Sequence, residues 1–207
     1  MISITKWPCV LVANQRSGST ALAINLAKQN DAIYYIEPFE QRVGLTSFME
    51  SLKDSNKKWL VKCMIDKIRP GHPYKKLLDI PNIYKIRLFR TNTVAQVASL
   101  YLSGITKMWF GNQLPGLNER HLIPLDELSL LPLDNDLMQH CASQITNNNR
   151  FLRDADKFVF DITCRYESLN LDNCDWRKSE LPDNYSKMLE FAEMHLRRAG
   201  HSLTFSL

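Results

Sequence analysis

The sequence lacks the features that mark several well-known classes of protein. Its five cysteines form no C-x-x-C pair, which argues against a zinc ribbon or a thioredoxin-like site. Its apolar runs, such as that from Val10 to Ala13, are far shorter than the about 20 residues of a membrane-spanning helix, so no span is expected. Only 7 of its 207 residues are glycine, and 44% are hydrophobic, which excludes a collagen-like or disordered chain. We predict one globular domain over residues 1–207.

Charge and cysteine usage limit the expected partners and compartment. The net charge of +4 is too small to indicate nucleic acid, and it suits an enzyme with an anionic ligand. The odd number and wide spacing of the cysteines favour free, mostly buried thiols in a reducing compartment. The N-terminal residues lead directly into a glycine turn that cleavage of a signal peptide would destroy, so a cytoplasmic protein is expected.

Short apolar runs alternate with segments of helical periodicity along the chain. Strands are expected at 8–14, 32–36, 59–65, 83–89 and 157–163, and helices at 19–29, 45–54, 93–103, 134–154 and 186–199. This alternation predicts an α/β fold, a three-layer sandwich with a central parallel sheet. The segment 104–133 has no clear period, and it is either a lid or acceptor-binding segment or an irregular surface excursion.

The turn after the first strand, in VLVANQRSGSTALAINLA, predicts an anion site. Backbone N–H groups and the positive end of the helix dipole converge in such turns. Gly18 allows close approach of the backbone, and Arg16 adds a full charge. The hydroxyls of Ser17, Ser19 and Thr20 add donors, and all three are plausible helix caps. The alternative is an ordinary turn capped by serine.

The turn departs from the Walker A motif of phosphate-binding loops. Ala13 replaces the first glycine of G-x-x-x-x-G-K-[ST], and Ser19 replaces the lysine that reaches the β- and γ-phosphates. Thr20 keeps the hydroxyl that binds magnesium in that motif. A phosphotransferase with a degenerate P-loop therefore stays open as an alternative.

The segment QRSGST resembles the 5′-phosphosulfate loop of sulfotransferases that use 3′-phosphoadenylyl sulfate (PAPS), most closely the bacterial trehalose sulfotransferase group. The resemblance implies a P-loop-like sulfotransferase fold, PAPS as donor and adenosine 3′,5′-bisphosphate as product. It also implies that the loop cradles the 5′-phosphate and sulfonate of the donor. The residues concerned are Gln15, Arg16, Ser17, Gly18, Ser19 and Thr20.

A second stretch, IYKIRLFRTNTVAQVASLYLS, is similar to the 3′-phosphate element of that group. In the family, an arginine that ends a strand and a serine eight or nine residues later bind the 3′-phosphate, and Arg90 and Ser99 match them. An arginine at the carboxyl end of a parallel strand lies where such sheets bind ligands. Thr91-Asn92 departs from the family pattern, and Asp161 to Leu169 echoes it loosely, in what we interpret as a structural role. Alone, Arg90 and Ser99 would be ordinary surface and helix residues.

Sulfonyl transfer needs a base, and the segment IEPFEQ at 36–41 supplies carboxylates directly after the second strand. It matches the E-P-x-E stretch of the trehalose group, which implies Glu40 as base with Glu37 beside it. Carboxylates this close can raise one another's pKa. His121 is the main rival, whereas His195 and His201 are expected at the surface. The alternative is a pair of solvated carboxylates.

Lys62 lies inside the expected strand WLVKCMI, at the place of a lysine in the related group. It contacts donor or acceptor in one interpretation, and points to solvent in the other. Trp109 and Phe110 are candidates for stacking on a sugar or adenine, although aromatic residues are more often core. Trp176-Arg177-Lys178 matches the place where relatives close over the 3′-phosphate, but a solvated charge pair is preferred.

The sequence thus favours a PAPS-dependent sulfotransferase. Its acceptor is a carbohydrate or other small molecule with a hydroxyl, and no nucleic-acid partner or metal is expected. The chain is small for this class, so its acceptor site is either open or completed by a second copy in a homodimer. The rivals are a degenerate P-loop phosphotransferase and a module that binds an adenosine phosphate without catalysis.

Overall fold

The computed structural model describes residues 4–41, 44–53, 57–106, 132–154, 159–169 and 181–206. The chain divides into two compact units, one formed by Met1–Phe89 and Asn148–Asn173 and the other by Arg90–Asn147 and Cys174–Leu207. A single domain over the whole chain stays a prediction. Most of the expected lid segment, 104–133, lies outside the described residues, so its role is also still a prediction.

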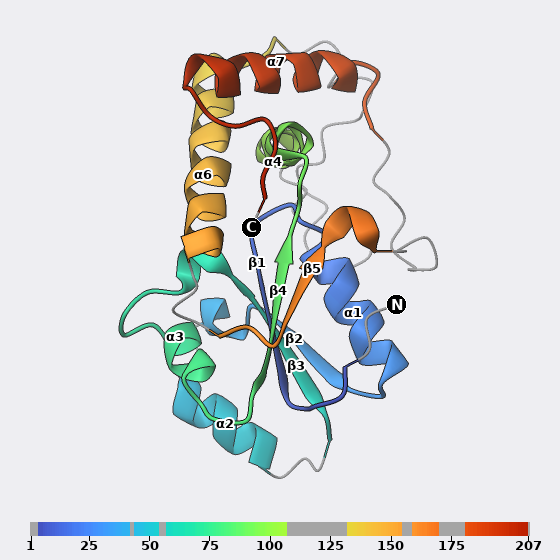
Figure 1. Ribbon diagram of the computed structural model, residues 1–207, viewed down its shortest axis with the longest axis vertical. Helices are drawn as coiled ribbons and strands as arrows, with labels where there is room; N and C mark the ends of the chain where they lie inside the picture. Colours follow the sequence, from blue (N-terminus) through green and yellow to red (C-terminus); the bar gives the residue numbers. More distant parts are fainter. Residues whose placement is uncertain are drawn as a thin grey trace. The chain divides into compact units, whose positions relative to one another are not determined.

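The first unit is built on a sheet of five parallel strands in the order β2-β3-β1-β4-β5 (Figure 1). The sheet places β1 at its centre, and all five residues of that strand are buried, as its continuous apolar run predicts. The α/β class with a central parallel sheet is therefore confirmed. The strands are β1 (Cys9–Ala13), β2 (Ile33–Ile36), β3 (Trp59–Met64), β4 (Tyr84–Phe89) and β5 (Ile162–Arg165).

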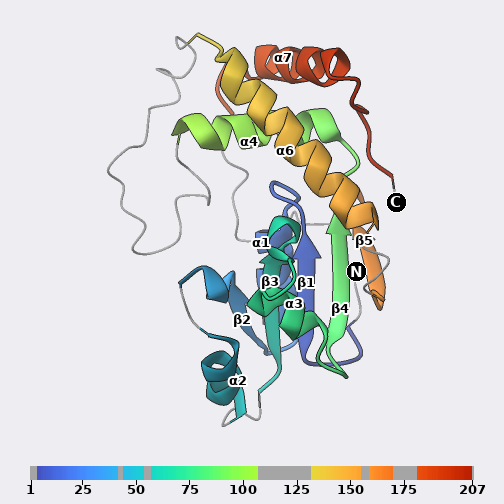
Figure 2. The same cartoon turned by 90° about the vertical axis from the view of Figure 1, so that its left-hand side faces the viewer.

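Helices flank this sheet, with α1 (Ser19–Gln29) on one side and α3 (Pro73–Leu78) on the other (Figures 1 and 2). Leu22, Ala23 and Leu26 form one stripe of α1, and they join Leu11 and Leu60 of the sheet in a buried cluster. The helix α2 (Leu45–Lys53) adds Phe48, whose ring packs edge-on against aromatic rings of neighbouring elements. Short 3₁₀ helices follow three strands: η1 (Pro38–Gln41), η2 (Ile65–Lys67) and η4 (Tyr166–Ser168).

The fifth strand begins later in the chain than the sequence predicts. The apolar run predicts a strand over 157–163, but β5 begins at Ile162. Asp161 fixes this start, since its N–H donates to the Lys85 carbonyl and its carboxylate accepts from the Lys85 N–H at 2.8 Å. Val159 is 79% exposed, and Phe160 lies beneath the Arg87 guanidinium. Val159 and Phe160 therefore lie outside the ladder that they were expected to join.

The second unit is helical and contains α4 (Thr93–Thr106), the first part of α6 (Asn135–Asp154) and α7 (Tyr185–Arg198). Their buried faces share one apolar cluster, in which Val97 and Tyr101 of α4 meet Met138 of α6 and Ala192 of α7. The C-terminal segment returns to the start of α4, where Asn92 and Thr204 form an antiparallel bridge. All three helices match predicted ones to within a few residues.

The buried face of α7 corrects a prediction about histidine. Met188, Ala192, His195 and Leu196 are buried on this helix, whereas Ala199, expected in the stripe, is exposed. His195 is only 8% exposed, and its Nε2 lies 3.2 Å from the Asn135 amide oxygen. Burial lowers the pKa of His195, and Arg198 lowers it further. The expected surface position of His195 is therefore wrong.

Other sequence-based expectations can be compared with the described residues. Cys9, Cys63, Cys141 and Cys164 are free and buried, as predicted, while Cys174 lies outside the described residues. Burial raises the pKa of the Cys9 thiol to about 12, which disfavours the thiolate, the reactive form of cysteine. Among the helices in the described part of the chain, none has the length and apolarity needed to cross a bilayer.

Candidate functional site

The turn between β1 and α1 lies at the point of the sheet where ligands of such folds bind. The strand order places β3 and β2 on one side of β1 and β4 and β5 on the other, so the connections from β1 and β3 run in opposite directions. Open parallel sheets bind ligands at the carboxyl ends of the strands where this reversal occurs. The residues in that position are those that follow Ala13, the last residue of β1.

The backbone of this turn is held in an uncommon shape. Gly18 has φ 73° and Arg16 has φ 56°, both in the left-handed region. Gly18 is the N-cap of α1, and no side chain caps the helix there. The predicted capping by Ser17, Ser19 or Thr20 is therefore wrong. The positive end of the α1 dipole meets the turn without a side-chain acceptor at its cap, which leaves that end suited to an anion.

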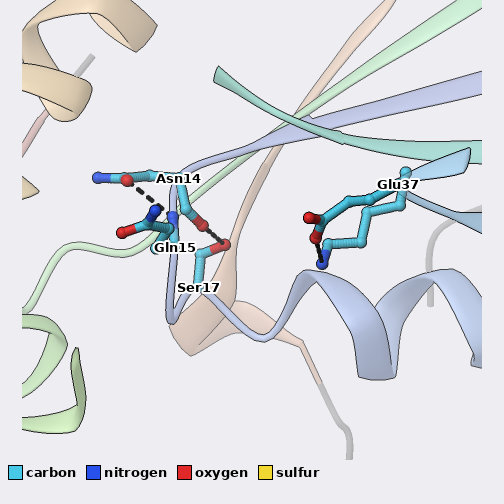
Figure 3. A network of polar contacts seen from close by, with 5 residues as sticks. Asn14, Gln15, Ser17 and Glu37 are labelled. Carbon is cyan, nitrogen blue, oxygen red and sulfur yellow. Dashed lines mark hydrogen bonds and ion pairs between the residues drawn. The ribbon is translucent and has the colours of Figure 1, made fainter. Parts of the chain in front are cut away.

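Asn14 organises the turn, although no pattern in the sequence points to this residue (Figure 3). Its side-chain oxygen accepts from the Gln15 N–H at 2.7 Å, and its carbonyl accepts from the Ser17 hydroxyl at 2.6 Å. Its side-chain amide donates to the Asn149 oxygen at 2.7 Å, which ties the turn to α6. Asn14 and Ser17 are fully buried, and Asn149 is 4% exposed.

Tyr166 packs against the other end of the turn. A Cβ placed on Gly18 would lie 2.3 Å from Cε2 and 2.6 Å from Cδ2 of the Tyr166 ring, so the ring lies directly on the glycine. Tyr166 begins η4 and packs against the buried cluster around β1, which restricts its movement. Gly18 is thus required both for its φ and for this close approach. The contact gives the Asp161 to Leu169 stretch a packing role, as we interpreted it from the sequence.

Lys62 is buried and paired with Glu37. Lys62 is 3% exposed, and its Nζ lies 2.6 Å from the Glu37 carboxylate (Figure 3). In the sheet, Lys62 lies between Leu11 of β1 and Ile36 of β2, so it belongs to a central strand. The interpretation in which Lys62 points to solvent is therefore wrong. An ammonium in this position needs a partner, because burying an isolated charge is costly.

Glu37 holds a strained backbone at the end of β2. Its φ is 51°, which is uncommon for a residue with a side chain, and its N–H donates to the Lys62 carbonyl at 3.1 Å. Lys62 thus meets Glu37 through both its backbone and its side chain. Left-handed residues other than glycine cluster at functional sites, where the surroundings hold them in place.

Glu40, the predicted base, lies in η1 on the exposed side of the same segment. Its carboxylate pairs with Lys67 at 3.2 Å, with 37% of the glutamate side chain exposed. Each glutamate therefore pairs with a lysine: Glu37 pairs with Lys62, and Glu40 pairs with Lys67. Asp66 adds a third carboxyl group, and burial raises the pKa of Asp66, while Lys67 opposes that rise. Nothing in the sequence pattern signalled Asp66 or Lys67.

Arg90 and Ser99 belong to the second unit. Arg90 directly follows the last residue of β4, and Ser99 lies on α4, so the predicted strand-arginine-helix-serine order is present. The Ser99 carbonyl accepts from the Ser103 hydroxyl at 2.9 Å within the helix. Their predicted role with a 3′-phosphate stays a prediction. Trp109, Phe110, His121 and Trp176-Arg177-Lys178 lie outside the described residues.

Within the described residues, no group of three or more histidine, cysteine, aspartate or glutamate side chains is placed to hold a metal ion. The groups suited to an anionic ligand in the first unit are the turn, with its guanidinium at Arg16 and its hydroxyls, and the start of α1. The groups able to exchange protons are the carboxylates of Glu37, Glu40 and Asp66. Such an arrangement can bind a phosphate or sulfate ester and accept a proton from a neighbouring hydroxyl.

Comparison with known proteins adds little to this geometry. No protein family model matches the chain, and no curated protein matches it. Among solved structures, the chain is similar to one from the PezAT chromosomal toxin-antitoxin system of Streptococcus pneumoniae, with 14% identity and a TM-score of 0.42. The match covers 95% of this chain and 89% of that one. A likeness of this degree carries no information about function.

Proposed function

We propose that the protein is a PAPS-dependent sulfotransferase, which transfers a sulfonate group from PAPS to a hydroxyl of a small-molecule or carbohydrate acceptor. The observation that carries the proposal is the turn from Asn14 to Thr20 at the carboxyl end of the central strand. Its backbone is preshaped, it begins a helix without a side-chain cap, and it lacks the lysine of ATP-binding loops.

The turn suits a phosphosulfate group because it offers many donors and a single full charge. The N–H groups at the start of α1 and the hydroxyls of Ser19 and Thr20 can donate to the oxygens of such a group. Arg16 adds a guanidinium that binds phosphate or sulfate oxygens with two bonds. A kinase would instead need a cation at position 19 to reach the β- and γ-phosphates, and that position holds a serine.

The proposal assigns the 3′-phosphate of the donor to Arg90 and Ser99. The support is the chain order, in which an arginine follows β4 and a serine lies within the next helix. It also rests on the resemblance of this stretch to the trehalose sulfotransferase group. A second phosphate-binding element would let the protein prefer PAPS over nucleotides that lack a 3′-phosphate.

In the reaction, the acceptor oxygen attacks the sulfur atom, and the bond from sulfur to the phosphate oxygen breaks. Adenosine 3′,5′-bisphosphate leaves, and the hydroxyl proton passes to a carboxylate, which we assign to Glu40. Glu40 suits this role because it follows β2 at the carboxyl end of the sheet and its side chain is partly exposed. Arg16 would stabilise the charge that develops on the leaving oxygen. Glu37 forms an ion pair with the buried Lys62, and this pair holds the segment in place.

Ligand binding by the unmodified protein tests the proposal. Calorimetry should show tighter binding of adenosine 3′,5′-bisphosphate than of AMP. At a hundred times its dissociation constant, the bisphosphate should add about 2.7 kcal/mol to the free energy of unfolding. Equal binding of the two nucleotides would remove the 3′-phosphate site from the proposal.

Two further measurements separate this function from its rivals. Turnover of ATP with magnesium would favour the degenerate phosphotransferase, and its absence is expected. Transfer of labelled sulfonate from PAPS to a panel of sugars and small alcohols would establish the activity. Tight binding of the bisphosphate without transfer to any acceptor would favour a binding module instead.

A further inference from the structure

The turn that we propose as the donor-binding loop is held from outside by two residues far along the chain. Asn149, in the last part of α6, accepts a hydrogen bond from the Asn14 side chain at 2.7 Å. Tyr166, at the start of η4, places its ring against Gly18. Both residues belong to the same compact unit as the turn.

We infer that Asn149 and Tyr166 are positioning residues of the anion-binding turn, which they hold in the shape that receives the 5′-phosphate end of the donor. The inference rests on the proposed function for the identity of the ligand. The contacts themselves stand on the geometry alone. Neither residue needs to touch the ligand for this role, since each acts through Asn14 or Gly18.

The Asn149 contact fixes the first half of the turn. Asn14 uses its side-chain oxygen for the Gln15 N–H and its amide for Asn149, so the bond to α6 sets the orientation of the whole amide group. Asn14 is fully buried, and loss of the Asn149 oxygen would remove a hydrogen bond from this buried amide. Released from Asn149, the amide can rotate, and the Gln15 N–H loses a fixed acceptor. The backbone at Arg16, with its φ of 56°, depends on such contacts to stay in the left-handed region.

The Tyr166 contact fixes the second half. The ring occupies the space on the side of Gly18 where other residues carry Cβ, at 2.3 Å from the ideal Cβ position. It is held there by the apolar cluster around β1 and β4. The backbone of Gly18 is therefore enclosed on this side, and the start of α1 cannot shift toward the ring. Preorganised donors of this kind bind a charged group without a further cost of ordering them.

The experiment compares two ligands across a small set of variants of the full chain. Calorimetry gives the dissociation constants of adenosine 3′,5′-bisphosphate and adenosine 3′-monophosphate, which differ only in the 5′-phosphate. Their ratio reports the contribution of the turn, and a general loss of stability does not change it. Asn149→Ala and Tyr166→Ala should each reduce this ratio about tenfold, whereas Asn147→Ala, at an exposed position two residues earlier in α6, should leave it unchanged.

Conservative variants identify which part of each side chain acts. Tyr166→Phe keeps the ring on Gly18 and should bind both ligands as the unmodified protein does. Asn149→Asp keeps an acceptor for the Asn14 amide and should retain the ligand ratio that Asn149→Ala loses, although its buried carboxylate lowers the thermal stability. A ratio that is unchanged in both alanine variants would overturn the inference, and so would a Tyr166→Phe variant as impaired as Tyr166→Ala.

A double-mutant measurement without ligand separates this inference from the proposed function. Gly18→Ala should lower the unfolding temperature by about 5–10 °C, and by less when Tyr166 is already alanine, because the new methyl group then has space and only the strain of the left-handed backbone remains. Equal shifts in both backgrounds would overturn the contact at Gly18. If the unmodified protein bound neither nucleotide, both the proposed function and the ligand-binding role inferred here would fail. The two unfolding measurements without ligand would then test only the contact between Tyr166 and Gly18.

Discussion

The turn after β1 and the acidic segment after β2 lie at the carboxyl ends of two strands in one sheet, yet they are built in different ways. Hydrogen bonds hold the turn in its shape, and Asn14, which accepts two of them, is fully buried. Charges shape the acidic segment, in which Glu37 pairs with Lys62 and Glu40 pairs with Lys67. The first arrangement fixes a backbone, whereas the second places carboxylates at two different depths.

The difference in depth separates two glutamates that look equivalent in the sequence. The Lys62 partner of Glu37 has a side chain that is 4% exposed, whereas the Lys67 partner of Glu40 has one that is 31% exposed. The Glu37 side chain is 23% exposed and that of Glu40 is 37% exposed, so we propose that Glu37 supports the sheet and that Glu40 receives the acceptor's proton. We expect binding to depend on the turn, chemistry on Glu40, and stability on Glu37.

The largest expected effect tests this division of roles. Glu40→Gln should slow sulfonate transfer by roughly 10²–10⁴-fold, the usual contribution of a general base, because the amide cannot accept the acceptor's proton. Its affinity for adenosine 3′,5′-bisphosphate should stay nearly unchanged. The measurement is single-turnover transfer from PAPS to whichever acceptor the panel identifies.

His121→Ala is the matched comparison for the base, since His121 was its main rival in the sequence. Normal transfer by Glu40→Gln together with loss of transfer by His121→Ala would reassign the base to the histidine. Normal transfer by both variants would leave the donor site standing but remove the mechanism proposed for this segment.

The next effect concerns stability at the buried pair. Glu37→Gln should lower the free energy of unfolding by about 3 kcal/mol, near the lower end for breaking a buried pair, because it removes the carboxylate that pairs with the buried Lys62 ammonium. Urea unfolding measures this difference. Glu37→Gln combined with Lys62→Met should recover most of the loss, since the buried charge is then also removed. Failure of the double variant to recover would mean that Glu37 stabilises the segment by other contacts.

Much of the sheet and its flanking helices could be predicted from local sequence. The apolar run of β1 and the helical stripe of α1 are strong patterns, and both elements lie within one residue of their predicted bounds. The predicted start of β5 was wrong because an apolar run such as KFVF carries no information about where pairing with the neighbouring strand begins. Pairing with β4 starts only at Ile86, opposite Ile162.

The candidate site could be predicted only in part. The turn residues are contiguous, and their spacing carries a signal, so they could be found. Asn149 and Tyr166 meet the turn across more than 130 residues of chain, and an asparagine in a helix or a tyrosine after a strand gives no indication of such a partner. The same holds for Lys67, whose pairing with Glu40 depends on where β3 ends.

A smaller effect on binding should distinguish the two ends of the donor. Arg16→Ala and Arg90→Ala should each weaken binding of adenosine 3′,5′-bisphosphate by about 1.5–3 kcal/mol, the contribution of hydrogen bonds to charged groups. Only Arg90→Ala should abolish the preference for the bisphosphate over AMP. Calorimetry with both nucleotides gives the comparison, and full discrimination in Arg90→Ala would contradict the assignment at the end of β4.

The smallest effect is expected at the exposed pair of Lys67 and Glu40, which can be compared with the pair of Lys62 and Glu37. Lys67→Ala removes the partner of Glu40, but water can solvate the remaining carboxylate because 37% of the Glu40 side chain is exposed. Pairs between exposed charges typically contribute about 0.2–1 kcal/mol, and salt screens them. The free energy of unfolding should therefore fall by less than about 1 kcal/mol, and the difference should shrink at high salt. Urea unfolding at low and high ionic strength measures both. A loss as large as that of Glu37→Gln, independent of salt, would show that η1 depends on Lys67 as strongly as β2 and β3 depend on Lys62, and Glu40 would then belong to the frame instead of the reactive surface.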